Sequence, residues 1–493
     1  MEQGGERGMM TFDQSLYDLY VEGAISLENA LNHADSRNNL ALRIRHNAGT
    51  PAKATDAKSE AVGRRPPTSD RVSPSPKRCA IGDNIVSSSL HSVFAVNPFK
   101  AFQVARLPEI RFGNGVLDQL PEILADYGRH ALLVTGRRSL QQTPRWQRLL
   151  EAMEDAGIDW RQISVADEPS PELVDEAVGR HRNDRIDVVV GIGGGSVLDA
   201  AKAIAGLLRS GTSVLDHLEG VGRGLPYSGP SVPFVAVPTT AGTGSEATKN
   251  AVLSRRGEDG FKKSFRDHRL IARVALVDPS LLESCPKEIV AANGMDALTQ
   301  LLESYVSLRA SPFTDALASS GMQAFRDGFW QAWQPDDPLA QQGLQKLAYA
   351  SLCSGITLAQ CGLGSVHGLA SPLGAYFPIP HGVACGTLVA TATRCNIEAL
   401  RKRAPNGPAL RKYAEAGILL SGRMYASESA AQDSLCDLLE QWTTRLALPR
   451  LGTFGMGESD IERVVANCRG SSMQTNPLVL TDDELAALLR QRL

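Results

Sequence analysis

A glycine-rich string offers the clearest site for an anion. Val188–Val190 predicts a buried strand, Gly193, Gly194 and Gly195 follow it, and a helix is expected to begin near Ser196. Because glycine lacks Cβ, the backbone there can approach a ligand closely, and the start of a helix offers free N–H groups to an anion. A tight strand-to-helix turn without a ligand is the alternative, and the spacing is not the G-x-G-x-x-G of Rossmann folds.

A second string of small and hydroxyl-bearing residues follows the predicted strand Phe234–Val237. It runs from Pro238 to Thr248 as PTTAGTGSEAT. Such a loop can satisfy its own backbone through its hydroxyl groups, which is the alternative to ligand binding. One predicted helix and one predicted strand separate it from the glycine-rich string. Two strings arranged in this way favour a phosphate-bearing cofactor.

Both strings resemble those of the iron-containing alcohol dehydrogenases. The first matches the pattern G-G-G-S-x-x-D-x-x-K through Asp199 and Lys202, and the second matches P-T-T-x-G-T-G-S-E. The resemblance extends over about residues 100–493 and implies a dehydrogenase that uses NAD or NADP. The cofactor-binding residues that it implies are Gly136, Gly193, Gly194, Gly195, Ser196, Asp199, Thr239, Thr240, Thr243, Ser245 and Lys262.

The residue after the first strand of the dinucleotide fold bears on the choice between NAD and NADP. A carboxylate there binds the adenosine ribose hydroxyls and repels a 2′-phosphate. Gly136 stands where many NAD-dependent relatives carry aspartate, and Arg137 and Arg138 follow it. Guanidinium groups suit a phosphate, so the pattern favours NADP, although both arginines can equally be ordinary surface charges.

The same resemblance implies one divalent metal, with one ligand altered. Asp296 and Gln300 are four residues apart on a predicted helix and share a face. In the family this helix supplies an aspartate and a histidine, so Gln300 replaces a ligand. His367, in GLGSVHGLASPLG, and His381, in PHG, match the other two ligands. A lone histidine beside glycines is commonly structural, but the order and spacing of these strings favour a metal set of Asp296, Gln300, His367 and His381.

The altered ligand weakens the predicted site without removing it. Three protein ligands and an open position are the usual layout of a catalytic zinc site. The amide oxygen of Gln300 can also coordinate, although it is a poorer donor than imidazole for iron or zinc. We therefore expect Fe²⁺ or Zn²⁺ at reduced affinity.

The resemblance implies hydride transfer between the nicotinamide and a small alcohol or aldehyde, with His367, His381 and Ser371 as catalytic residues. The metal would polarise the substrate oxygen. Ser371 replaces a histidine that the family usually carries beyond the ligands, so its hydroxyl is a candidate for proton exit. Three alternatives remain: a metal-independent reductase resembling maleylacetate reductases, in which the two histidines donate protons or anchor substrate, a lyase resembling dehydroquinate synthase, and a non-catalytic scaffold for pilus machinery.

Alternating strand and helix signals supply the scaffold for these residues. The strand signals end near Asp278, and Ala/Leu-rich helical stretches follow. We predict an α/β dinucleotide-binding domain with a parallel sheet over residues 97–285, an all-helical metal and substrate domain over 286–493, a dehydroquinate synthase-like architecture, and a site in the cleft between them. The predicted elements are strands at Arg129–Thr135, Ile186–Val190, Phe234–Val237 and Val274–Val277 and a helix at Glu172–Arg180.

The first hundred residues have a different character. Residues 9–46 resemble the C-terminal tail of the retraction ATPases of type IV pili, and residues 1–46 predict a short helical segment. No G-x-x-x-x-G-K-[ST] loop precedes them, so we do not expect ATPase activity. A gene-fusion remnant and a docking tag are the two interpretations. Residues 47–96, rich in Pro, Ser, Ala and charge, predict a flexible linker.

Composition excludes several classes of partner. The formal net charge is −3 over 493 residues, so no basic field for a nucleic acid is present. Eight cysteines without C-x-x-C spacing indicate reduced thiols. No signal peptide and no run of 18 apolar residues occurs, so we expect a cytoplasmic protein without a membrane partner. The family resemblance adds the expectation of a homo-oligomer.

Overall fold

The computed structural model describes residues 100–137 and 140–493, together with eight isolated residues nearer the N-terminus. The predicted helical segment over 1–46 and the predicted linker over 47–96 lie outside the described residues, apart from those eight. Among the eight, Ala30 is buried, and Tyr17, Tyr20, Leu31 and Ile44 pack against it. The chain divides into two compact units, Met1–Ala95 and Val96–Leu493, and the second unit carries every residue discussed below.

A parallel six-stranded sheet forms one half of this unit, in the order β1-β8-β5-β4-β2-β3. Apart from β1 at the edge, this is the flavodoxin-like strand order, in which ligands bind where the order reverses, here between β2 and β4. Gly193 of β4 pairs with Pro238 of β5, so the two strands end together. The strands are β1 (Glu109–Phe112), β2 (His130–Gly136), β3 (Asp159–Val165), β4 (Val188–Gly193), β5 (Phe234–Pro238) and β8 (Val274–Val277).

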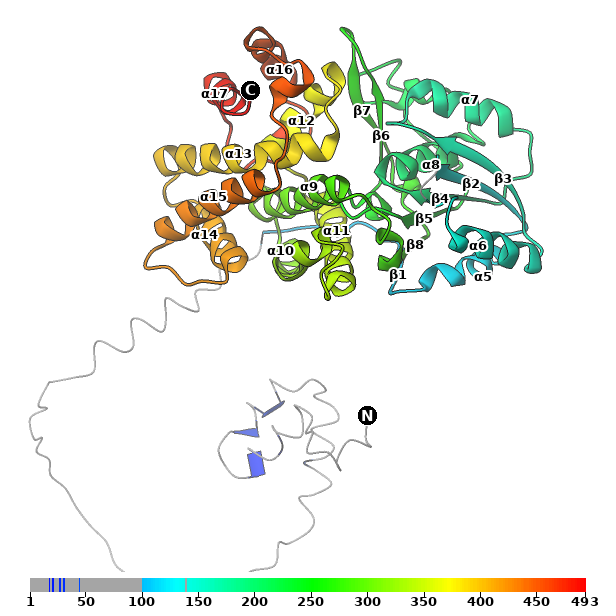
Figure 1. Ribbon diagram of the computed structural model, residues 1–493, viewed down its shortest axis with the longest axis horizontal. Helices are drawn as coiled ribbons and strands as arrows, with labels where there is room; N and C mark the ends of the chain where they lie inside the picture. The colour runs from blue at the N-terminus through cyan, green and yellow to red at the C-terminus, as the bar shows by residue number, and fades with distance from the viewer. Residues whose placement is uncertain are drawn as a thin grey trace, which may run out of the picture. The chain divides into compact units, whose positions relative to one another are not determined.

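Helices cover both faces of the sheet because the central strands are apolar on both sides. Val189 packs among residues of α7 (Pro171–His181) and α8 (Gly195–Leu207) on one face. Its neighbours Val188 and Val190 pack on the other face, against α5 (Leu120–Ala125) and α6 (Pro144–Asp155). Strand residues that alternate in this way belong to two separate cores. Figure 1 shows the resulting three layers.

An antiparallel hairpin follows β5 and lies between the sheet half and the helical half. It consists of β6 (Asn250–Arg255) and β7 (Phe261–Arg266). β6 packs against α8, and β7 packs against α12 (Ser365–Tyr376) of the helical half. Figure 1 shows the hairpin between the two halves of the unit.

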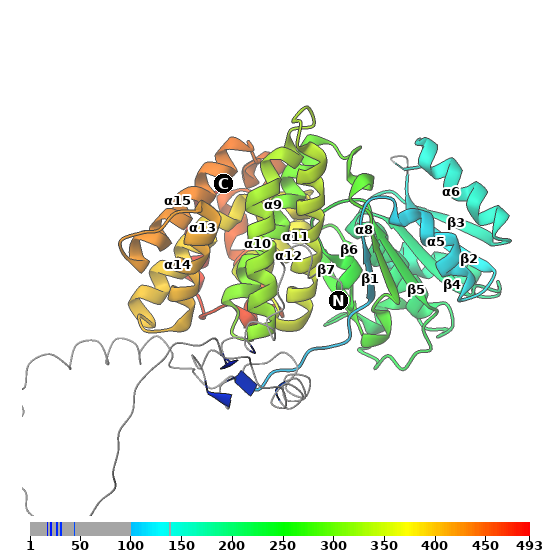
Figure 2. The same cartoon turned by 90° about the horizontal axis from the view of Figure 1, so that it is seen from below.

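The other half is entirely helical and surrounds α9 (Lys287–Val306), which is buried on all sides from Val290 onward. Three helices pack along it, α10 (Pro312–Trp333), α11 (Ala340–Cys361) and α13 (His381–Arg403). Figure 2 shows this bundle beside the sheet. The remaining helices are α14 (Pro408–Ser421), α15 (Glu428–Arg445), α16 (Ile461–Asn467) and α17 (Asp482–Arg490). The predicted fold class, a parallel α/β half followed by a helical half, is confirmed.

The two halves pack backbone to backbone where Gly244 meets Gly355. Gly244, in the loop after β5, has φ +60°, in the left-handed region that favours glycine. A Cβ on Gly244 would lie 2.3 Å from Cα of Gly355 in α11, and a Cβ on Gly355 would lie 2.2 Å from the carbonyl oxygen of Gly244. No side chain fits at either position without moving one half away from the other.

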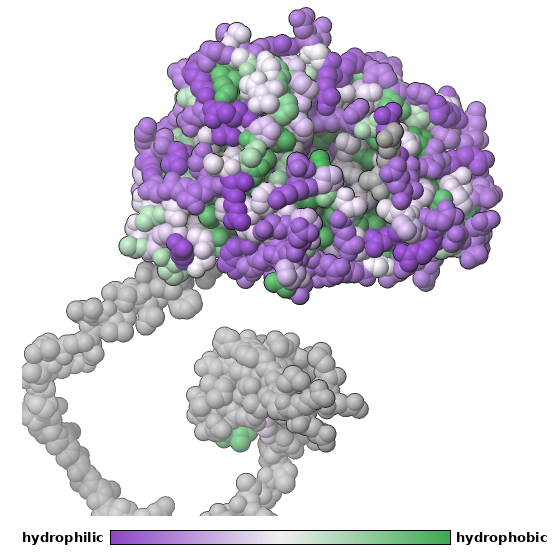
Figure 3. Space-filling view, in the orientation of Figure 1, coloured by the Kyte–Doolittle hydropathy of each residue, from purple (hydrophilic) through white to green (hydrophobic). Residues whose placement is uncertain are grey.

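Three further features concern the expected absence of membrane spans and disulfide bonds: the surface, the helix lengths and the cysteines. Figure 3 shows a predominantly hydrophilic face over the described residues. No single helix within the described part of the chain is long and apolar enough to cross a membrane; α11 and α12 together pass that test, but they meet at a bend of 98°. The seven cysteines that the structure describes are free thiols, and Cys79 lies outside it.

Candidate active site

The glycine-rich string and the hydroxyl-rich string pack directly against each other. β4 ends at Gly193, and α8 begins at Gly195. A Cβ on Gly195 would lie 2.6 Å from the side chain of Thr243, and one on Gly194 would lie 3.2 Å from Thr240 Oγ1. The backbone at the start of α8 can therefore meet the second string only because these residues lack side chains. The two strings form one surface with free N–H groups at its centre.

Lys202 of α8, which follows the glycine-rich string, joins it to the second string by hydrogen bonds. Its side chain is fully buried, and its Nζ lies 2.9 Å from both the carbonyl oxygen and the hydroxyl of Ser245 and 2.6 Å from the carbonyl oxygen of Asn250. Asp199 accepts a hydrogen bond from the Ser245 hydroxyl at 2.6 Å and one from the Val252 N–H at 3.1 Å. Burial lowers the pKa of Lys202, and the charge of Asp199 opposes that effect. Lys202 and Asp199 thus hold the loop in shape.

Four potential metal ligands converge in the helical half, and we call them the Asp296 cluster: Asp296, His367, His381 and Cys385. Among the residues that the structure describes, their ligand atoms lie within 4.8 Å of one another. Asp296 comes from α9, His367 from the first turn of α12, and His381 and Cys385 from the first two turns of α13. Three separate helices therefore contribute, which places the cluster at a fixed point of the bundle.

Glu303 sets the orientation of His367. Its carboxylate lies 2.7 Å from His367 Nδ1 and accepts hydrogen bonds from the N–H groups of Gly364 and Val366 at 2.9 and 2.6 Å. His367 Nε2 consequently faces the cluster, 3.2 Å from Asp296 Oδ1. Burial opposes charge on His367, but its contacts with Cys385, Asp296 and Glu303 raise its pKa well above the usual value. A carboxylate behind an imidazole is the common support of a metal-binding histidine.

The remaining members of the cluster differ in their exposure: Asp296 and Cys385 are fully buried, whereas the side chain of His381 is 28% exposed and lines the cavity described below. Burial raises the pKa of the Cys385 thiol to about 12 and lowers that of His381 to about 4. For Asp296, burial opposes ionisation, but the interactions with His381 and His367 prevail and lower its pKa to about 2. Asp296 Oδ2 and His381 Nδ1 are buried without a hydrogen-bond partner. Unsatisfied buried polar atoms are rare, and Asp296 Oδ2, which belongs to a carboxylate of the cluster, indicates a missing partner there. His381 faces the cluster with Nε2 and not with Nδ1.

Gln300 lies one turn along α9 from Asp296 and is buried. Its amide oxygen accepts a hydrogen bond from the hydroxyl of Ser354 at 2.7 Å. Its side chain also lines the cavity described below. The predicted shared face of residues 296 and 300 is thus present, with the Gln300 oxygen engaged by Ser354.

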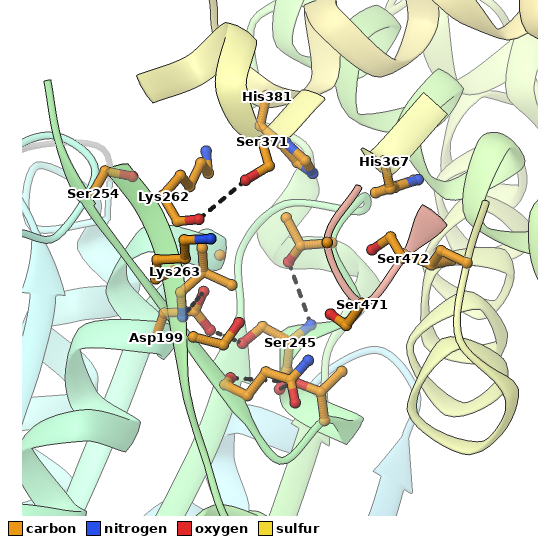
Figure 4. A pocket seen from close by; sticks show the side chains of 18 of the residues that line it. Asp199, Ser245, Ser254, Lys262, Lys263, His367, Ser371, His381, Ser471 and Ser472 are labelled. Atoms are coloured by element: carbon orange, nitrogen blue, oxygen red, sulfur yellow. Dashed lines mark hydrogen bonds between the residues drawn. The ribbon is translucent and has the colours of Figure 1, made fainter. Parts of the chain in front are cut away.

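Lys262 and Ser371 meet on the hairpin side of the site. Ser371 Oγ donates to the carbonyl oxygen of Lys262 at 3.0 Å, and Lys262 Nζ donates to Glu168 at 2.6 Å. Glu168 also accepts from the Ser254 hydroxyl at 2.7 Å. Burial opposes ionisation of Glu168, but the charge and hydrogen bond of Lys262 lower its pKa. Figure 4 shows Ser254, Lys262 and Ser371 around the same opening as His367 and His381.

One cavity of about 270 Å³ joins the strings to the Asp296 cluster. It brings together ten of the residues predicted from the sequence: Gly195, Ser196, Asp199, Thr243, Ser245, Lys262, Gln300, His367, Ser371 and His381. Asp296 lies behind the two histidines. Gly193, Gly194, Thr239 and Thr240 belong to the packed ends of β4 and β5, and Gly136 ends β2 with open space where its Cβ would be. Arg137 is exposed beside it, and Arg138 lies outside the described residues.

Three residues of the site were missed by reasoning from the sequence. Cys385 follows His381 by four residues, a spacing that places both on one face of a helix. Glu303 follows Asp296 by seven residues, two turns further along α9, so the periodicity contained a signal for it as well. Glu168 lies after β3 and reaches the site only through the fold, so no local pattern could have indicated it.

Two family models match the chain. "Iron-containing alcohol dehydrogenase" matches residues 108–279, and "Fe-containing alcohol dehydrogenase family, C-terminal" matches residues 290–493. Together they cover both halves of the second unit.

Relatives of assigned activity cover the same part of the chain. The long-chain-alcohol dehydrogenase 1 of Geobacillus thermodenitrificans is 32% identical over 395 residues, 78% of this chain and 96% of that protein. The NAD-dependent methanol dehydrogenase of Bacillus methanolicus is 28% identical, over 78% of this chain and 98% of its own. The NADPH-dependent butanol dehydrogenase of Clostridium saccharobutylicum is 28% identical, over 76% and 94%.

Solved structures agree in fold. The crystal structure of a 1,3-propanediol oxidoreductase superposes with a TM-score of 0.72 at 28% identity and covers 80% of this chain and all of its own. A sulfoacetaldehyde reductase from Bifidobacterium kashiwanohense, solved in complex with NAD⁺, superposes with a TM-score of 0.69 at 26% identity, over 80% of this chain and 99% of its own.

Proposed function

The chain belongs to the iron-containing alcohol dehydrogenase family, and from this premise we propose that its cavity is where a hydride passes between NAD(P) and a small alcohol or aldehyde. The family assignment makes the protein an NAD(P)-dependent alcohol dehydrogenase. It favours hydride transfer over the lyase, metal-independent and scaffold alternatives, because the relatives that match are alcohol dehydrogenases and aldehyde reductases.

The continuity of the cavity carries this proposal. Gly195 and Ser196, at the start of α8, and His367 and His381, in the helical half, line the same space. A cofactor whose phosphates rest on the start of α8 would extend its nicotinamide toward the two histidines. Hydride transfer needs the two reacting carbons held in contact, which a shared cavity provides.

The residues of the Asp296 cluster fit a divalent cation. Asp296 Oδ2 is buried without a partner, His381 Nε2 faces Asp296 and Cys385, and His367 is oriented by Glu303. We propose that Asp296, His367 and His381 hold the cation, with Gln300 at the edge of the site. The bound cation supplies Lewis-acid polarisation of the substrate oxygen.

The chain's own groups then bind, orient and move a proton. The N–H groups at the start of α8 and the hydroxyl of Thr243 bind the cofactor on one side of the cavity, and Ser245, whose hydroxyl is bonded to Asp199 and Lys202, keeps the loop in shape beside them. Alcohol oxidation sends a hydride to the cofactor and releases the hydroxyl proton; Ser371 Oγ is the proposed carrier, which takes up this proton and passes its own to solvent in the cavity. Ser371 lies one turn beyond His367 on α12, lines the cavity and gives its present hydrogen bond to the carbonyl oxygen of Lys262, from which it can turn.

For the cofactor, NADP is proposed over NAD. Gly136 ends β2 without a carboxylate, and the exposed guanidinium of Arg137 follows it. A guanidinium suits a 2′-phosphate, whereas an aspartate there would repel one. The relatives include both an NAD-dependent and an NADPH-dependent enzyme, so the choice is a property of the individual chain.

The experiment is a reduction assay with the full chain. Protein stripped of metal and then reloaded with Zn²⁺ or Fe²⁺ is mixed with short-chain aldehydes and either NADPH or NADH. We expect aldehyde-dependent oxidation of the cofactor, faster with NADPH, that disappears on stripping and returns on reloading. Activity that survives exhaustive chelation would instead favour the metal-independent reductase, and failure of both cofactors to bind by fluorescence would overturn the proposal.

A further inference from the structure

Cys385 lies beside the two histidines of the Asp296 cluster. It follows His381 by one turn at the start of α13, so the two side chains project from the same face of the helix. Its side chain is fully buried. The Cys385 sulfur lies 3.6 Å from His367 Nε2 and 3.8 Å from His381 Nε2.

Three of the four printed distances in the cluster are close to those of tetrahedral ligands around one ion, and the fourth, from Asp296 Oδ1 to His381 Nε2, is longer at 3.9 Å. With Zn–S of about 2.3 Å and Zn–N of about 2.0–2.1 Å, a sulfur and a nitrogen ligand stand roughly 3.6 Å apart, and two nitrogen or oxygen ligands roughly 3.3 Å apart. The two sulfur–nitrogen distances are 3.6 and 3.8 Å, and Asp296 Oδ1 lies 3.2 and 3.9 Å from the two Nε2 atoms. The sulfur therefore lies at ligand distance from both imidazoles, where a thiol can donate a hydrogen bond and a thiolate can share a cation with them.

An independent observation points to a ligand at the same place. Asp296 is fully buried, and its Oδ2 has no hydrogen-bond partner. A buried carboxylate oxygen without a donor is costly, and a cation among the four side chains removes that cost. At the expected ligand position, the amide oxygen of Gln300 accepts a hydrogen bond from the hydroxyl of Ser354.

We propose that the Cys385 thiolate is the fourth protein ligand of the cation and takes the place that Gln300 leaves. The inference rests on the proposed function, since it concerns the same cation. On binding, the sulfur–hydrogen bond breaks, a sulfur–metal bond forms and the proton passes to solvent. Thiolate is a softer ligand than imidazole and suits zinc, so an Asp-His-His-Cys set favours Zn²⁺ over the iron of the family name.

The test uses Co²⁺ as a spectroscopic probe of the metal-stripped full chain. A thiolate bound to Co²⁺ gives a sulfur-to-metal charge-transfer band in the near ultraviolet, which carboxylate and imidazole ligands do not give. We expect this band in the wild type and its loss in Cys385→Ser. Cys436→Ser removes another buried thiol, in α15, and should leave the band unchanged. Zn²⁺ affinity should fall at least about tenfold in Cys385→Ser, since even indirect support of a ligand has that effect.

A double variant distinguishes the loss of a metal ligand from a folding defect in Cys385→Ser. Cys385→Ser with Gln300→His restores three imidazoles and one carboxylate, so Zn²⁺ affinity should recover while the charge-transfer band stays absent. One equivalent of Co²⁺ bound by the wild type without the band would overturn the inference and leave the proposed function standing. A wild-type band in a protein with no aldehyde-dependent cofactor oxidation would support the inference and overturn the proposed function.

Discussion

Lys202 Nζ lies 2.9 Å from both the carbonyl and the hydroxyl oxygen of Ser245, so a fully buried lysine of α8 is hydrogen-bonded to the loop that follows β5. The two strings on which cofactor binding depends are therefore one structural element. The charge of Lys202 is balanced by Asp199, 3.4 Å away, which in turn binds the Ser245 hydroxyl.

Removing this lysine should destabilise the protein strongly. In Lys202→Met the mostly buried carboxylate of Asp199, whose side chain is 14% exposed, loses its charge partner, and the carbonyl oxygens of Ser245 and Asn250 lose their donor, at a cost of about 3–5 kcal/mol. Urea unfolding followed by circular dichroism measures the difference. Lys402→Met, at an exposed position near the end of α13, is the control and should change stability by at most about 0.5 kcal/mol. Adding Asp199→Asn to Lys202→Met should recover part of the loss; a double variant less stable than the single one would contradict this account.

Gly195→Ala should weaken cofactor binding. The new Cβ would lie 2.6 Å from the side chain of Thr243, so the two strings must separate. Overpacking of this kind costs about 1–3 kcal/mol. Cofactor binding, which requires the original spacing of the strings, has to overcome that cost, so the affinity for NADPH in a fluorescence titration should fall roughly 5- to 150-fold. Gly179→Ala, in an exposed turn of α7 with open space around its Cβ, should bind NADPH normally and be slightly more stable. Equal affinities in the two variants would refute the packing argument.

Glu246 should make stability depend on pH. Burial raises its pKa from 4.5 to about 7, so the folded protein binds this proton more tightly than the unfolded chain does. The resulting stability is complete below pH 4.5 and is lost as the pH rises through about 7, by roughly 3 kcal/mol in all. Glu246→Gln should lack this loss and exceed the wild type in stability at pH 8. Glu462→Gln, which removes an exposed carboxylate of α16, is the control. Parallel pH profiles of wild type and Glu246→Gln would exclude Glu246 as the source.

Ser371→Ala tests the proposed proton path. Loss of the hydroxyl should lower kcat or shift its pH dependence, while the dissociation constant of NADPH stays near that of the wild type. Ser371 also donates a hydrogen bond to the carbonyl oxygen of Lys262. The loss of this structural contact must therefore be distinguished from the loss of a proton carrier. Ser371→Thr keeps a hydroxyl and should restore the pH profile. Unchanged kinetics in Ser371→Ala would remove Ser371 from the path.

Gln300→His tests whether position 300 faces the cation. A third imidazole at this place should slow the loss of Zn²⁺ to a chelator by about tenfold or more, since imidazole is a better donor than a neutral amide. Ser354→Ala, which removes only the hydrogen bond to Gln300, serves as the control. An unchanged rate of metal loss in Gln300→His would place residue 300 outside the reach of the ion.

The sequence allowed much of the α/β half to be predicted because its central strands are buried on both faces. The apolar runs Phe234–Val237 and Val274–Val277 correspond to β5 and β8 almost residue for residue. β3 was missed because it lies at the sheet edge and exposes most of its side chains, so it has no apolar run. The hairpin β6–β7 was missed for a related reason, since β7 reads FKKSFR.

The candidate site was predictable where it depended on local strings and unpredictable where distant segments meet. Gln300 stood out from the sequence because it breaks an expected pattern. Its hydrogen bond to Ser354 and the approach of Cys385 to His367 depend on how α9, α11, α12 and α13 pack together. The metal ligands and the cofactor-binding roles stay predictions until the experiments above are done.

The contact between Gly244 and Gly355 has a consequence for how such proteins can diverge. Each glycine blocks a side chain on the other, so neither site is free to mutate first. A lineage that acquires a larger residue at one of them must simultaneously shift α11 away from the cofactor loop, which would alter the shape of the cavity. We therefore expect the pair to be inherited as a unit, and a survey of related sequences should find the two positions changing together or not at all.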